Sequence, residues 1–144
     1  MRVGEELRRA AELLQRGAVD DARSILSALL EREPDNADAL NLLGIALAQR
    51  REYGAAVEIL RRAVRLNPNH AGARANLANS LKRLGRLAEA AEHFERALAL
   101  KPDNLSALRQ WATVLFDLQR FDEAIAAFNT SVRLRPDDAA SYLG

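Results

Sequence analysis

The second of four similar stretches in this chain decides the fold, and it reads ADALNLLGIALAQRREYGAAVEILRRAVRLNP from Ala37 to Pro68. Its apolar and small residues fall into two groups, each spaced to form one stripe on a helix. The first stripe consists of Leu40, Leu43, Gly44 and Leu47, and the second consists of Ala56, Ile59, Leu60 and Ala63. The polar residues 50–52 between the stripes indicate a turn. The stretch therefore predicts a helical hairpin that ends at a proline, which has no amide hydrogen and stops a helix.

The prolines of the chain indicate that this hairpin is repeated. All four of them, Pro34, Pro68, Pro102 and Pro136, lie 34 residues apart. Equally spaced helix stops indicate one structural unit that is used four times. Alignment on the prolines predicts eight helices, which span residues 4–16, 19–32, 37–50, 53–66, 71–84, 87–100, 105–118 and 121–134.

Residues of the same type recur at the same position of each unit. One position is alanine in every unit, at Ala22, Ala56, Ala90 and Ala124. Another position is always small, at Ala10, Gly44, Ala78 and Ala112. Small side chains let two helix axes cross at about 8–10 Å. The alanine position therefore predicts the closest approach between helices.

Turn and capping residues follow the same period. Gly17 and Gly85 lie at the turn inside the first and third units, where a left-handed residue is expected. The residue pairs after the prolines, at 35–36, 69–70, 103–104 and 137–138, offer N-caps for the next helix. Among these caps, His70 is expected to be the weakest.

Composition restricts the classes of partner and the location. The 144 residues carry a formal net charge of +1, from 21 basic and 20 acidic residues, which gives no support for a nucleic-acid partner or a membrane-surface partner. No stretch approaches the ~18 uninterrupted apolar residues of a membrane span, and the N-terminus lacks the apolar run of a signal peptide. We therefore expect a cytoplasmic protein.

The residues that carry enzyme chemistry are sparse. The chain has no cysteine, and its two histidines, His70 and His93, are too far apart for a metal-binding HxxH or HExxH motif. The glycines are scattered, so that neither a phosphate-binding loop nor a nucleophile elbow is present. We expect no catalytic residues, no metal, no cofactor and no enzymatic activity.

The aligned positions resemble the tetratricopeptide repeat. Its signature combines a bulky residue, a small residue, a leucine or tyrosine, then an alanine, an aromatic residue or leucine, a second alanine and a proline. The third unit supplies Leu77, Ala78, Leu81, Ala90, Phe94, Ala97 and Pro102. The resemblance implies an all-α fold, an α-α superhelix of about eight antiparallel helices. It also implies a concave surface, lined by the first helix of each pair, that holds a peptide or a partner segment.

The array is predicted over residues 3–138, with units at 3–36, 37–70, 71–104 and 105–138. The first unit has Arg9 in place of a bulky apolar residue and Leu29 in place of a small one, as expected of an N-terminal cap. Residues 139–144 resemble the start of a further repeat helix or a truncated cap. Without a polar cap, the outer apolar face of the fourth unit is expected to be exposed. Two hypotheses account for this end: the sequence is a fragment of a longer protein, or the end packs on another copy of the chain to form a homo-oligomer.

The groove residues follow from projecting each first helix at 3.6 residues per turn and taking the side opposite the core. The predicted peptide-binding groove consists of Leu7, Leu14, Asn41, Leu42, Ile45, Asn76, Asn79, Lys82, Arg83, Arg109, Gln110, Thr113 and Phe116. The N-terminal half of this set is apolar, and the C-terminal half carries amide and basic groups. Asparagine amides suit a peptide backbone, and arginine suits a carboxylate. We therefore expect a protein or peptide ligand with an acidic portion.

The favoured function is a scaffold or adaptor that binds a partner segment in this groove and has no catalysis of its own. Two alternatives stay open. The chain can be the substrate-recruiting arm of a larger enzyme, such as a glycosyltransferase, or a structural array that associates with itself.

Overall fold

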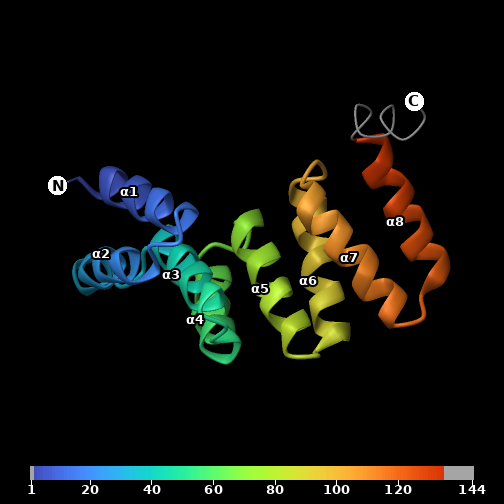
Figure 1. The fold of residues 1–144 in the computed structure, drawn as a ribbon, viewed down its shortest axis with the longest axis horizontal. Coiled ribbons are helices and arrows are strands. Elements are labelled where there is room, and N and C mark those ends of the chain that lie inside the picture. The colour runs from blue at the N-terminus through green and yellow to red at the C-terminus, as the bar shows by residue number, and fades with distance from the viewer. Residues whose placement is uncertain (1, 135–144) are drawn as a thin grey trace.

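The computed structural model describes residues 2–134, and the start of a further unit that the sequence suggests at 139–144 lies outside this range. The described residues form eight helices and no strand (Figure 1). Each observed bound differs from the predicted one by at most one residue. The helices are α1 (Val3–Gln15), α2 (Val19–Arg32), α3 (Ala37–Gln49), α4 (Tyr53–Leu66), α5 (Ala71–Arg83), α6 (Leu87–Leu100), α7 (Leu105–Asp117) and α8 (Phe121–Arg133).

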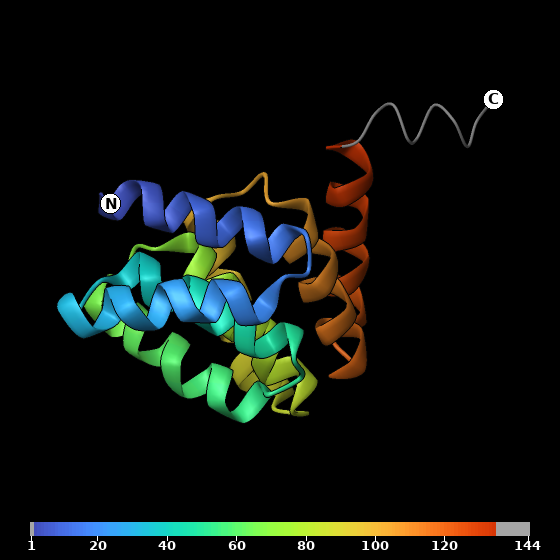
Figure 2. The same cartoon turned by 60° about the vertical axis from the view of Figure 1, so that its left-hand side comes forward.

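The helices pair into antiparallel hairpins that stack side by side into a curved array (Figures 1 and 2). Each helix packs on its neighbours in the chain, and the first helices of successive hairpins, α1, α3, α5 and α7, also contact one another. Within residues 2–134, no two second helices are in contact. The first helices are therefore closer together, and they line the inner side of the curve.

The same turn closes all four hairpins. Gly17 and Gly85 adopt the left-handed conformation that was predicted for them, with φ of 78° and 80°. The equivalent residues of the other two hairpins, Arg51 and Gln119, adopt it as well, with φ of 60° and 64°. In each hairpin, the amide after this residue donates to the carbonyl of a leucine five residues earlier, at 2.8–2.9 Å. This is the hydrogen bond of a Schellman motif, and it fixes how the second helix of each hairpin leaves the first.

Small side chains let the helices approach closely, as the sequence predicts. The four alanines at positions 22, 56, 90 and 124 are essentially inaccessible to solvent. Gly44 is equally constrained, because a Cβ atom at this residue would lie 2.5 Å from the Cγ of Leu60. Three apolar clusters fill the space between the layers and run along the array.

Candidate ligand-binding groove

A cavity of about 200 Å³ lies where α3, α4 and α5 meet. Its lining combines apolar, amide, phenol and guanidinium groups, from Ile45, Ala48, Gln49, Tyr53, Asn76, Asn79 and Arg83. Four of these residues, Ile45, Asn76, Asn79 and Arg83, belong to the predicted groove set. The structure thus brings part of the predicted set together at the junction of the second and third hairpins.

Arg83 and Tyr53 form the polar end of this cavity. The guanidinium carbon of Arg83 lies 5.6 Å from the centroid of the Tyr53 ring, which is the geometry of a cation–π contact. Arg83 remains exposed, and it follows Lys82, so the last turn of α5 carries two positive charges, of which Arg83 lines the cavity. A planar guanidinium held by a ring can present two parallel N–H donors to a carboxylate.

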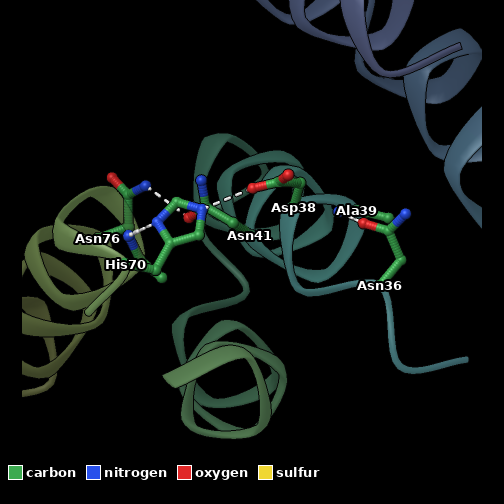
Figure 3. Close-up of polar contacts among 7 residues, drawn as sticks. Asn36, Asp38, Ala39, Asn41, His70 and Asn76 are labelled. Carbon is green, nitrogen blue, oxygen red and sulfur yellow. Dashed lines mark hydrogen bonds and ion pairs between the residues drawn. The ribbon is translucent and has the colours of Figure 1, made fainter. Parts of the chain in front are cut away.

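Two asparagines join adjacent first helices beside the cavity. Asn76 on α5 donates from Nδ2 to Oδ1 of Asn41 on α3 at 2.9 Å (Figure 3). Each amide has one acceptor oxygen and two donor hydrogens. The bond therefore leaves Oδ1 of Asn76 and both hydrogens on Nδ2 of Asn41 for other partners. A peptide backbone, which needs one donor and one acceptor per residue, matches these groups.

His70 caps α5 and connects it to the preceding hairpin. Its Nδ1 accepts from the amide of Ala73 at 3.1 Å, and its Nε2 lies 2.9 Å from Oδ1 of Asp38 on α3 (Figure 3). Because Nδ1 accepts, the hydrogen is on Nε2, which donates to the carboxylate. The sequence predicts that His70 is the weakest of these caps. It makes the same capping bond as Asn36 and Asn104, whose bonds are 2.9 and 3.0 Å long, and its relative strength stays a prediction. The ring is longer than an asparagine side chain and reaches both partners.

Removing this cap is expected to destabilise the array. His70→Ala should lower the free energy of unfolding by about 0.5–2 kcal/mol, the usual contribution of an N-cap. His70→Asn keeps a capping oxygen and loses only the contact with Asp38, so it should recover most of this loss. Urea denaturation followed by circular dichroism measures both changes. Equal losses in the two variants would show that the cap contributes little.

The N-terminal groove residues contribute mainly to packing. Leu7, Leu42 and Ile45 are partly buried against the apolar cluster of the first two hairpins. Leu14 departs from the expectation, because only 5% of its surface is exposed and it belongs to that cluster itself. Its side chain faces the core, so it cannot offer the apolar groove surface that the projection assigned to it.

The C-terminal groove residues lie apart from the cavity. Arg109 turns toward α8, where its Nε donates to Oγ of Ser131 at 3.4 Å. Gln110 bonds Ser106 and Thr113 bonds the backbone of Arg109, both within α7. Phe116 packs edge-on against Phe121, with 5.2 Å between ring centroids, at the C-terminal end of the array. These residues therefore do not share one pocket with Asn76 and Arg83.

Tyr53, Ala48 and Gln49 line the cavity but do not belong to the predicted groove set. Tyr53 occupies the position where the other units have Val19, Leu87 and Phe121, which are all apolar. Tyr53 is the only one of the four with a polar group, its hydroxyl. A tyrosine in an otherwise apolar column is the signal that the sequence offers, and the structure shows this residue half-buried.

A second polar contact joins α5 to α6. Arg74 is buried, its Nε donates to the carbonyl oxygen of Pro68 at 2.8 Å, and its Nη1 lies 3.4 Å from Nδ1 of His93. Burial and then the charge of Arg74 lower the pKa of His93. The imidazole is therefore neutral near pH 7 and can accept a hydrogen bond from the guanidinium. The equivalent positions hold Glu6, Leu40 and Leu108, so this contact is particular to the third unit.

The part of the chain that the structure describes holds no group of three or more His, Asp or Glu side chains that could bind a metal ion. Among the eight helices, none has the length and apolar character required to cross a bilayer.

Comparisons with known proteins agree with the repeat pattern of the sequence. A family model of the tetratricopeptide repeat matches residues 7–71, 53–104 and 75–139. A MamA AMB-1 structure is 30% identical, with a TM-score of 0.76, over 92% of this chain and 78% of that chain. A MamA MSR-1 structure is 28% identical, with a TM-score of 0.74, over 96% of this chain and 79% of the other. A crystal structure of MamA at 24% identity has a TM-score of 0.82, over 96% of this chain and 81% of that one, and shows the shared fold alone. The comparison with curated proteins found no match.

Proposed function

Because the chain belongs to the tetratricopeptide repeat family, we propose that it is an interaction scaffold whose inner surface binds an extended partner segment with an acidic side chain. The repeats and the similar structures support a protein-interaction scaffold in general. The finer proposal rests on one observation, the convergence of Ile45, Asn76, Asn79 and Arg83 on a single cavity. We take residues 3–138, with the four units given above, as the binding array.

The proposed binding mode assigns each wall of the cavity to one part of the ligand. Arg83, held by Tyr53, receives a carboxylate, with Asn79 beside it as a further amide. Asn41 and Asn76 form hydrogen bonds with the ligand backbone through the amide donors and acceptor that are not used in their bond to each other. Ile45 and Ala48 contact an apolar side chain that precedes or follows the acidic one. A segment of two or three residues would fill this space.

Selection from a phage-displayed library of random ten-residue peptides tests the proposal. The chain should enrich peptides that contain Asp or Glu next to an apolar residue. Arg83→Glu should weaken the enriched peptides roughly 10–100-fold, since a hydrogen bond to a charged group contributes about 1.5–3 kcal/mol and becomes a repulsion. Fluorescence anisotropy with the labelled peptides measures the affinity.

Arg65→Glu is the matched control. Arg65 is an exposed arginine in the last turn of α4, so the variant makes the same change of charge away from the lining of the cavity. It should bind the selected peptides as the original chain does. Equal affinity of the original chain and Arg83→Glu, or enrichment without acidic residues, would contradict the proposal.

A further inference from the structure

The outer side of α8 carries a continuous apolar stripe, which we call the α8 seam and define as Phe121, Ile125, Phe128 and Val132. Their exposed fractions are 47%, 58%, 41% and 56%. All four are large hydrophobic residues on one face of one helix, and Phe116 packs against Phe121 at one end. A group of large exposed apolar side chains on a helix marks an interaction surface.

The same positions are covered in the interior of the array. The residues of α6 that correspond to Ile125 and Phe128 are Ala91 and Phe94, which are 2% and 0% exposed. Those of α4, Val57 and Leu60, are also buried. In each case the first helix of the following hairpin packs on this face. The α8 seam is therefore a stacking surface that requires another apolar helix, and no described residue covers it.

The N-terminal end of the array does not offer such a helix. Every exposed large hydrophobic residue within 2–134 lies at or after Leu66, so the first hairpin contributes none. Its open side carries a hollow in which Leu13, Ile25 and Ala28 lie among the charged side chains of Glu6, Arg9 and Asp21, and Glu6 forms an ion pair with Arg32. A head-to-tail stack would place these charges against the α8 seam, where their desolvation is costly.

We propose that a second copy of the chain covers the α8 seam, with the two α8 helices antiparallel about a two-fold axis. The seam residues are spaced by four, three and four positions, which is the alternation of a and d positions in helices that pack side by side. Such a contact is self-complementary and closes as a dimer.

The charges of α8 select the antiparallel arrangement. Asp122 lies in the first turn of α8, and Arg133 lies in the last turn. In an antiparallel pair, the first turn of one helix lies beside the last turn of the other, so Asp122 faces Arg133 of the second copy. A parallel pair would bring the like charges together. The helix dipoles also oppose each other in the antiparallel pair, which is favourable.

Sedimentation and light scattering over a concentration series test the dimer. The intact chain should be dimeric at high concentration, and Ile125→Glu should raise the dissociation constant about 100-fold, because it buries an unpaired charge. Leu66→Glu is the control, since Leu66 is an exposed leucine at the end of α4. It should leave the dimer unchanged. Circular dichroism should show equal helicity in all three proteins.

Disulfide crosslinking distinguishes the arrangement, because the chain has no cysteine of its own. Asn129→Cys places one thiol near the middle of α8, and it should yield a crosslinked dimer under mild oxidation. Arg9→Cys, on the N-terminal end, should not. A chain that stays monomeric at all concentrations would overturn the proposal. The seam would then be covered by residues 135–144 or by another protein. Crosslinking only in a mixture of the two variants would overturn it in favour of a head-to-tail contact. Peptide binding in the groove is measured separately and does not depend on either outcome.

Discussion

Replacing Phe94 by alanine is expected to lower the free energy of unfolding by about 3–5 kcal/mol, the range for removing a buried aromatic side chain. Phe94 is fully buried and is among the largest enclosed side chains of the described residues. It belongs to the central apolar cluster, which joins the second, third and fourth hairpins. The variant therefore leaves a cavity where several hairpins meet. Urea denaturation followed by circular dichroism measures the loss.

Phe128→Ala is the matched control for this experiment. Phe128 occupies the same position of the following unit, yet 41% of its surface is exposed. The same atoms are removed from a site that is only partly enclosed, so the loss should be less than half of that at Phe94. The comparison is made at a concentration at which the chain is monomeric, because a dimer would bury Phe128. Equal losses at the two positions would contradict the assignment of Phe94 to the shared core.

The repeat is the reason that the fold could be predicted from the sequence. A position such as the alanine column is observed four times, so an accidental apolar residue in one unit does not mislead the alignment. The turns show the limit of this argument. Gly17 and Gly85 indicated a left-handed residue, but Arg51 and Gln119 adopt the same conformation without a residue type that predicts it. The hydrogen bonds of the turn impose the conformation on them.

The candidate site could be predicted only in part, because its contacts join residues of different hairpins. Helical projection placed Asn41 and Asn76 on the inner side, but their mutual hydrogen bond depends on how α3 and α5 are offset. The second contact of His70 likewise joins two hairpins, because its partner Asp38 is 32 residues away in the chain. For Leu14 the projection was wrong, because it predicted a groove residue and the side chain is buried. The angular position of a residue on its helix does not show how closely a neighbouring helix covers it.

A larger side chain in the alanine column should also lower the free energy of unfolding. Ala56→Leu is expected to cost about 1–3 kcal/mol of unfolding free energy, because Ala56 is fully buried where helices approach most closely. A leucine there must separate the helix axes or take a strained rotamer. The same denaturation experiment measures the change.

Ala55→Leu is the control for this substitution, because Ala55 is the adjacent residue of α4 and is exposed. Both variants place a leucine, which favours helices almost as well as alanine, in the same turn. The exposed variant should stay within about 0.5 kcal/mol of the original chain. If the two variants lose equal stability, helix propensity rather than close packing explains the invariant alanine. A loss confined to Ala56→Leu would show that the spacing between neighbouring helices limits this position, and the same limit then applies to the corresponding alanines of the other three units.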